Sequence, residues 1–152
     1  MSTIQVTNIN DLSDNAALVT DNGGIKTDKL TGKTTAGSIS VVGEGNSTTT
    51  NLQQGLAKAW CSLDDASTVV FYDSFNFASV TDNGTGNYTV AFTNSMSGTR
   101  YSSPPNVYSG EGDLANIANE ATGSFRLRCF EDSSPHPAKD IDCFTTTHGD
   151  LA

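Results

Sequence analysis

The dipeptide Asn83-Gly84 lies between two segments in which apolar and polar residues alternate, residues 79–81 and 88–93. Asn and Gly both tolerate the left-handed backbone conformation that a type I′ turn requires, so Asn-Gly in this setting is the strongest short-range signal for a β-hairpin. In the second segment the large side chains share one face, which carries Tyr88, Val90 and Phe92. An antiparallel sheet with one buried side produces this pattern. We therefore expect a hairpin around residues 82–87.

The composition extends this expectation to the rest of the chain. Its 152 residues include 20 Thr, 17 Ser, 13 Asn and 14 Gly. Thr packs well on a pleated sheet, Asn and Gly suit tight turns, and Ser, Thr and Asn are unfavourable inside helices. After a short helical turn near residue 52, further strands are expected at residues 56–63, 68–73, 75–80, 124–130 and 140–145.

The fold expected from these patterns is all-β, a small antiparallel β-sandwich or jelly-roll-like module over residues 52–152. Residues 1–51 contain no aromatic residue, so we expect an extended N-terminal arm, with a disordered leader as the alternative. Apolar residues form 36% of the chain, against roughly 45–50% in a typical globular domain. Because such a core is small, we expect the chain to complete it by assembling with other copies of itself.

Three segments of the module are expected to be less regular. Residues 95–112 contain Pro104 and Pro105 and predict loops. Residues 114–121 favour one or two helical turns, and residues 146–152 are expected to fray. In the strand at residues 124–130 the alternation predicts that Phe125, Leu127 and Cys129 face inward, and that the residues facing outward are Arg126 and Arg128.

Charge and hydropathy exclude several classes of partner. The net charge of −9 lacks the basic footprint that nucleic-acid binding needs. The N-terminus resembles no signal peptide, and no apolar run is long enough for a membrane span, so no membrane insertion is expected. The three cysteines are expected to be free buried thiols, and the only pair worth testing for a disulfide is Cys129 with Cys143.

The sequence contains no recognisable catalytic or metal-binding pattern. No Cys or His residues have the spacing of a zinc site, and no nucleophile elbow or phosphate-binding glycine loop occurs. The chain is therefore expected to be no enzyme and to hold no metal or cofactor. A glycan hydrolase remains the least favoured alternative.

The aromatic residues suggest a binding function, although a β core explains most of them more simply. Tyr72, Tyr101 and Tyr108 are the candidates for surface rings that stack on sugars. The binding residues expected in the loop-rich part of the chain are Tyr101, Asn106, Tyr108, Asp113 and His136.

The pattern GLAKAW…DSFN…SVTDNGTGNYTV…FT, within residues 48–97, resembles a tail-fibre-like or virion structural module of marine tailed phages. The resemblance covers about a third of the chain and implies a homotrimeric particle component made in the host bacterial cytoplasm. It also implies that the N-terminal arm docks onto other virion proteins of the tail, collar or capsid. It brings no catalytic residues.

The expected function is therefore a fibre-like virion subunit that contacts a host-surface polysaccharide. The alternative is an architectural component with no receptor role, such as a capsid decoration, a head fibre or a tail-fibre adaptor.

Overall fold

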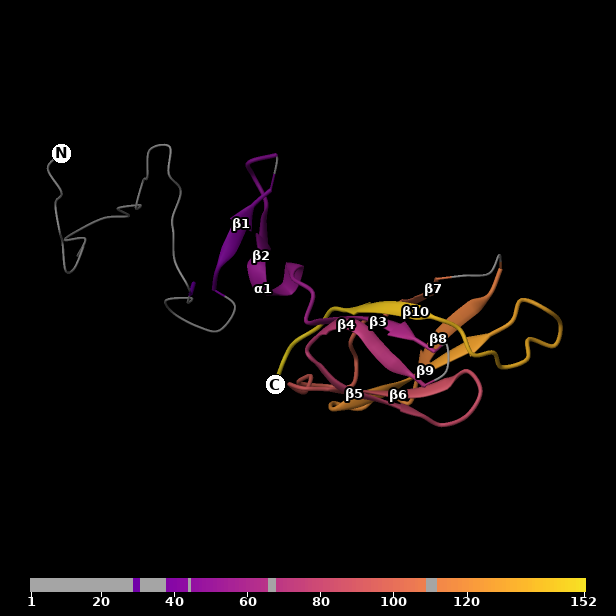
Figure 1. Ribbon diagram of the computed structural model, residues 1–152. Helices are drawn as coiled ribbons and strands as arrows, with labels where there is room; N and C mark the ends of the chain where they lie inside the picture. The colour runs from indigo at the N-terminus through magenta and orange to yellow at the C-terminus, as the bar shows by residue number, and fades with distance from the viewer. Residues whose placement is uncertain (1–28, 31–37, 44, 66–67, 109–111) are drawn as a thin grey trace, which may run out of the picture. The chain divides into compact units, whose positions relative to one another are not determined.

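The computed structural model describes residues 29–30, 38–43, 45–65, 68–108 and 112–152 (Figure 1). All the strands described below lie within the second of two compact units into which the chain divides, Met1–Thr31 and Gly32–Ala152. Most of the expected arm, residues 1–28, 31–37 and 44, lies outside the described residues. Its role in docking stays a prediction.

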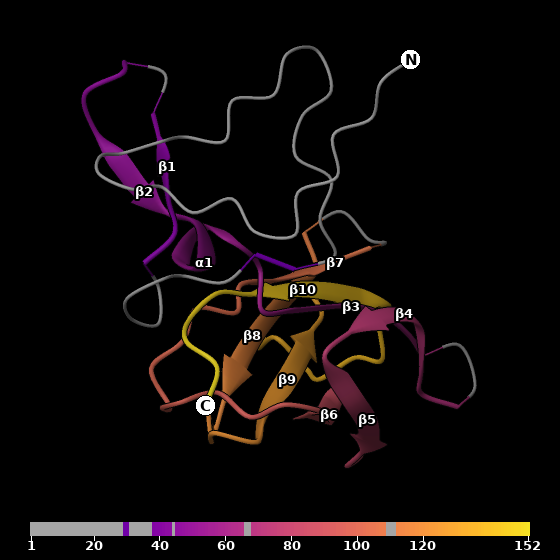
Figure 2. The ribbon, with the colours of Figure 1, turned by 90° about the vertical axis from the view of Figure 1, so that its left-hand side faces the viewer.

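Two four-stranded antiparallel sheets form a β-sandwich (Figures 1 and 2). In the first sheet the order is β4 (Val70–Phe75), β3 (Ala59–Asp64), β10 (Cys143–Thr147) and β7 (Pro105–Val107). In the second sheet the order is β5 (Phe77–Asp82), β6 (Asn87–Phe92), β9 (Ser124–Phe130) and β8 (Leu114–Ala118). The prediction of an all-β fold with packed antiparallel sheets is confirmed.

Strict alternation of buried and outward residues builds the core between the two sheets. In β6 the apolar residues Tyr88, Val90 and Phe92 are buried, as their spacing predicts. Strands of the opposite sheet contribute further small and apolar side chains, so side chains of the two sheets fill the core and no helix is needed to cover it. The buried core consists of Ala59, Cys61, Leu63, Phe77, Tyr88, Val90, Phe92, Met96, Phe125, Leu127, Cys129, Ile141 and Cys143.

A single residue, Asn76, connects the two sheets between β4 and β5. Its backbone is left-handed, with φ at 59°, a conformation that Asn tolerates better than most residues. The Asn76 amide nitrogen donates to the carbonyls of Lys58 and Asn94, while its oxygen accepts from the Asn94 backbone N–H at 2.8 Å. These bonds fix the corner at which the chain leaves one layer for the other.

The hairpin between β5 and β6 is present, but its turn differs from the predicted type I′ geometry. The connection has four residues, and Gly84 and Gly86 have positive φ values of 110° and 59°, whereas Asn83 does not. The Asn83 N–H donates to the Asn87 carbonyl at 2.8 Å, and the Asn83 amide nitrogen donates to Thr89 Oγ1 at 2.9 Å. Asn83 therefore stabilises the loop through hydrogen bonds instead of through left-handed geometry.

Gly86 also meets a close neighbour. A Cβ atom at this position would lie 2.4 Å from the Cys129 carbonyl oxygen, closer than any side chain allows. The Gly86 carbonyl accepts a hydrogen bond from the Cys129 N–H at 2.9 Å. Glycine is therefore required for the hairpin loop to lie against the end of β9.

Two expectations about secondary structure are wrong. Residues 114–121 form no helical turn: Leu114–Ala118 is a strand that pairs with β9. The C-terminal residues do not fray, because Thr146 and Thr147 belong to β10, His148 bridges to Ser102 and Leu151 bridges to Met96. In both cases pairing with a distant strand decides the local conformation.

Earlier in the sequence than the strands of the sandwich, β1 (Ser40–Val42) and β2 (Thr49–Asn51) form a separate two-stranded sheet. The expected short helical turn is α1 (Leu52–Gly55). Its N-cap is Asn51, whose side-chain oxygen accepts a hydrogen bond from the Gln54 N–H at 3.1 Å.

Candidate functional site

Tyr101, one of the five expected binding residues, is half-buried at the rim of the core. Its ring packs edge-on against Phe92 with the ring centres 5.5 Å apart. Its hydroxyl donates to the carbonyls of Ala121 and Ser124 at 3.0 and 3.1 Å. Burial raises the pKa of Tyr101 to about 12. These contacts anchor the loop after β6, and they leave only part of the ring to solvent.

Asn106 and Tyr108 lie together on and beside the short strand β7. Asn106 is exposed and pairs in register with Phe144 of β10, and its side-chain oxygen accepts from the Val107 N–H at 2.9 Å. Tyr108 is 77% exposed, while its backbone N–H donates to the Asp142 carbonyl at 2.9 Å. The ring of Tyr108 is thus held by an ordered backbone and faces solvent.

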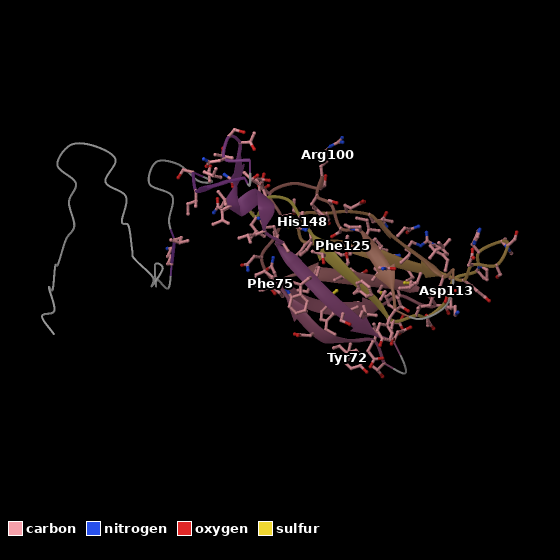
Figure 3. All side chains as sticks on the ribbon, turned by 90° about the horizontal axis from the view of Figure 1, so that it is seen from above. Tyr72, Phe75, Arg100, Asp113, Phe125 and His148 are labelled. Carbon is pink, nitrogen blue, oxygen red and sulfur yellow. The ribbon has the colours of Figure 1, made fainter. Side chains whose placement is uncertain are left out.

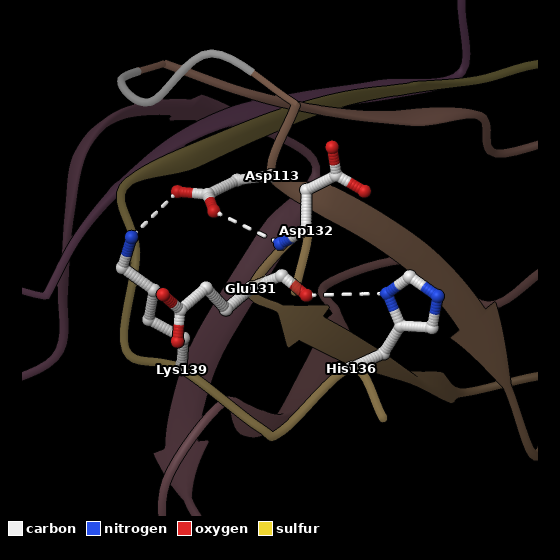
Figure 4. A network of polar contacts seen from close by, with 5 residues as sticks. All are labelled: Asp113, Glu131, Asp132, His136 and Lys139. Carbon is white, nitrogen blue, oxygen red and sulfur yellow. Dashed lines mark hydrogen bonds and ion pairs between the residues drawn. The ribbon is translucent and has the colours of Figure 1, made fainter. Parts of the chain in front are cut away.

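Asp113 and His136 belong to a polar network in the loops around β8 and β9 (Figure 4). Asp113 forms an ion pair with Lys139 at 2.8 Å and accepts from the Asp132 N–H at 3.4 Å. The hydrogen bond from Lys139 lowers the pKa of Asp113, and the same bond raises the pKa of Lys139. His136 Nδ1 lies 3.3 Å from the Glu131 carbonyl oxygen. This network holds the loops in place.

The five residues therefore occupy three places. Tyr101 lines a shallow cavity of about 430 Å³ with Arg100 and Asp150, while Asp113 lies far from Arg100 in Figure 3. Whether any of the three places contacts a glycan stays a prediction.

The outward face of the first sheet carries large apolar side chains that the sequence did not single out. We call this the aromatic face and define it by Trp60, Phe75 and Phe144, which are 38%, 52% and 41% exposed. Trp60 pairs in register with Phe75 on the edge strand β4, and Phe144 lies on the neighbouring strand β10. Val70 and Tyr72 are exposed on the same edge strand.

A cavity of about 560 Å³ adjoins one end of this face. Its walls include Leu56, Phe75 and Leu151, together with the side chains of α1. The ammonium group of Lys58 donates to the carbonyls of Gln53 and Leu56, so α1 is tied to the start of β3. The aromatic face therefore continues into a hollow with an apolar wall.

The outward face of the second sheet has the opposite character. In one row across the strands, Arg128 pairs with Asn87 on β6 and with Asn116 on β8. The next outward residue of β9 is Arg126, whose Nη1 donates to the Asn87 side-chain oxygen at 3.3 Å. The Arg128 guanidinium lies over the Phe130 ring, 5.2 Å from its centre. We call this the arginine face. The prediction that both arginines face outward is confirmed.

A polar group lies inside the sandwich where the β5–β6 hairpin loop meets β10. The hydroxyl of Tyr88 donates to carboxylates of Asp65 and Asp140, the second at 3.2 Å. Burial, followed by the hydrogen bond to Asp65, raises the pKa of Tyr88 well above its ordinary value. Burial also raises the pKa of Asp65, although the Tyr88 bond opposes this shift. The ring of Tyr88 is buried in the core, and its hydroxyl forms hydrogen bonds with the carboxylates of Asp65 and Asp140.

All three cysteines are free and buried, as expected. Burial raises the pKa of Cys61 to about 12. Cys129 of β9 and Cys143 of β10 share a hydrogen bond across the sandwich, which lowers the pKa of Cys129 and raises that of Cys143.

Three comparisons with known proteins found no match to this chain. No family model, no curated protein and no solved structure matches it. Within the described part of the chain, no group of three or more His, Cys, Asp or Glu residues is arranged to hold a metal ion. No helix among those residues is long and apolar enough to cross a membrane.

Proposed function

We propose that this chain is a fibre-like structural subunit of a tailed-phage particle, that it is not an enzyme, and that it works as a homotrimer. The pattern within residues 48–97 supports the assignment to a particle. The observation that carries the proposal of self-association is the aromatic face. In this account residues 1–51 attach the subunit to other virion proteins, and the protein is made in the host bacterial cytoplasm.

The aromatic face is costly to leave in water. The chain has 1 Trp, 4 Tyr and 7 Phe, and five of these twelve are exposed: Trp60, Tyr72, Phe75, Tyr108 and Phe144. Although the chain has few apolar residues, many of its aromatic side chains therefore lie on the surface. Burial of apolar surface stabilises an assembly by about 25 cal/mol per Å². Aromatic residues are also the residue types enriched at interfaces.

A second copy of the chain is the simplest partner for this face. Three copies around a threefold axis can turn the same face of each sheet inward, where Trp60, Phe75 and Phe144 bury one another. The arginine face then lies on the outside of the trimer, since it belongs to the other layer of the sandwich. This arrangement leaves one face for assembly and one for contact with solvent or host.

The outer parts of the trimer are proposed to contact a host-surface polysaccharide. Tyr108 favours this role, because it directly follows β7, its backbone N–H donates to the Asp142 carbonyl, and its exposed ring can stack on a sugar. The alternative is an architectural subunit without a receptor role. Competition tests separate the two: purified subunit that reduces phage adsorption supports receptor contact, and subunit that leaves adsorption unchanged supports the architectural role.

Labelling of the protein in intact particles tests the proposed function. Gold or antibody label is expected on purified virions by electron cryo-microscopy, at regular positions on tail, collar or capsid. Particles that carry no label, from a lysate in which the protein is abundant, would contradict the assignment.

A further inference from the structure

The two arginines of β9 lack carboxylate partners within the described residues. Acidic residues outnumber Lys and Arg by 17 to 8 in the chain. Even so, the only ion pair found among the described residues joins Lys139 to Asp113, and neither Arg126 nor Arg128 takes part in one. Two neighbouring cations on one sheet face therefore have no ion-pair partner among the residues that the structure describes, despite the excess of acids in the chain.

The residues beside Arg126 and Arg128 contact the two guanidinium groups without neutralising their charge. Phe130 supports the Arg128 guanidinium through its ring, at 5.2 Å. Asn87 accepts from Arg126 at 3.3 Å through its amide oxygen, so the Asn87 amide nitrogen is the end that remains to donate. Asn116 stands on the other side of Arg128 in the same row.

The arrangement suits an acidic polymer that carries hydroxyl groups beside its carboxylates. Side chains two positions apart on one strand face are separated by about 7 Å, so the two guanidinium groups can bind two separate carboxylates of one polymer. An arginine guanidinium binds a carboxylate with two parallel hydrogen bonds. Amide side chains beside it can donate to and accept from sugar hydroxyls. The net charge of −9 repels any polyanion at long range, and it repels a nucleic-acid duplex most strongly, because the duplex carries one charge per about 1.7 Å of its axis.

From these observations we infer that the arginine face, defined by Arg126, Arg128, Asn87 and Asn116, binds a carboxylate-bearing polysaccharide. Arg126 and Arg128 bind carboxylates of successive acidic sugars, and Asn87 and Asn116 bind hydroxyls between them. The inference deepens the proposed glycan contact and rests on it for its biological role. It moves that contact from the loops to the open face of a sheet.

Binding of the full chain to polygalacturonate tests this inference, with neutral dextran, dextran sulfate and single-stranded DNA as comparison polymers. Titrations are carried out by calorimetry at about 0.15 M salt, where screening over roughly 8 Å limits repulsion from distant acids. We expect binding to polygalacturonate alone. Each of R126Q and R128Q is expected to weaken it about tenfold or more, as the loss of a hydrogen bond to a charged group predicts. R100Q serves as the matched control, because Arg100 points away from the sandwich in Figure 3.

The possible outcomes are distinct. No binding of polygalacturonate by the unmodified chain, equal binding of dextran sulfate or DNA, or an equal loss in R100Q would each overturn the inference. Native mass and thermal unfolding of R126Q and R128Q, measured on the same samples, show whether folding and assembly persist. A trimer that binds no acidic glycan refutes this inference alone, whereas a monomer that binds it refutes the proposed assembly alone.

Discussion

The two outer faces of the sandwich differ although the same alternation builds both. The aromatic face exposes Trp60, Phe75 and Phe144 over the first sheet. The arginine face exposes Arg128 beside Asn87 and Asn116 over the second sheet. Both sheets turn apolar side chains inward, so the core between them does not require the two outward faces to differ. We propose that the difference between the faces reflects different partners outside the subunit.

This contrast also separates two kinds of interaction energy. Apolar burial is not directional and scales with area, so the aromatic face favours a large, permanent contact. Charged and amide groups contribute direction and depend on salt, so the arginine face favours a ligand that comes and goes. We expect assembly and ligand binding to respond to different substitutions.

The largest effect is expected from the double substitution W60S/F75S. Loss of two aromatic anchors at the centre of an interface costs about 2 kcal/mol or more each, which lowers the association constant by about a thousandfold. Native mass spectrometry at micromolar concentration is expected to show monomer. R126Q/R128Q is the matched control on the opposite face, and dissociation of that control as well would break the comparison.

The second effect concerns the interior that both faces share. Tyr88→Phe removes the hydroxyl that Asp65 and Asp140 accept from, and we expect a loss of about 2 kcal/mol in the free energy of unfolding. Urea unfolding measures this loss. Tyr72→Phe is the control, because Tyr72 is exposed. Equal stability of the two variants would mean that the buried hydroxyl contributes nothing.

A smaller, pH-dependent effect is expected at Asp65. Burial raises the folded-state pKa of Asp65, so its contribution to stability is fully present below the unfolded pKa and is lost as pH rises through the folded pKa. Asp65→Asn lacks this dependence. Unfolding free energies at pH 7 and pH 4 should favour the Asn variant more at pH 7, by less than about 1 kcal/mol because water screens the carboxylate. A difference that grows toward pH 4 would show the opposite sign.

The smallest effect on the fold is expected for R126Q/R128Q. Surface substitutions away from special features change stability by about 0.5 kcal/mol or less, and neither arginine faces the core. Thermal unfolding and native mass should both match the unmodified chain. A fall in mass would mean that the arginine face also takes part in assembly.

Strands with strict alternation could be predicted from the sequence, since local periodicity alone specifies them. Tyr88, Val90 and Phe92 are examples, and so is the outward direction of Arg126 and Arg128. Residues 114–121 could not be predicted in this way, because Leu114 and Ile117 also suit a helix. Residues 114–118 form a strand because they pair with β9, and no local sequence signal reveals this pairing.

The candidate sites were harder to predict than the fold. Alternation placed Trp60 on one face of its strand, and Cys61 and Leu63 on the other. The sequence gives no local sign of which of these two faces is the outer one. The sequence also favoured Tyr101 for its position in a loop-rich segment. Its half-buried ring and two hydrogen bonds depend on Phe92, Ala121 and Ser124, which come together only in the folded chain.

Native mass spectrometry of the unmodified full chain tests the central claim most directly. The claim is that the aromatic face is an assembly surface between copies. It predicts a species of three times 15.9 kDa at micromolar concentration in about 0.15 M salt. A single species of 15.9 kDa under the same conditions would contradict it.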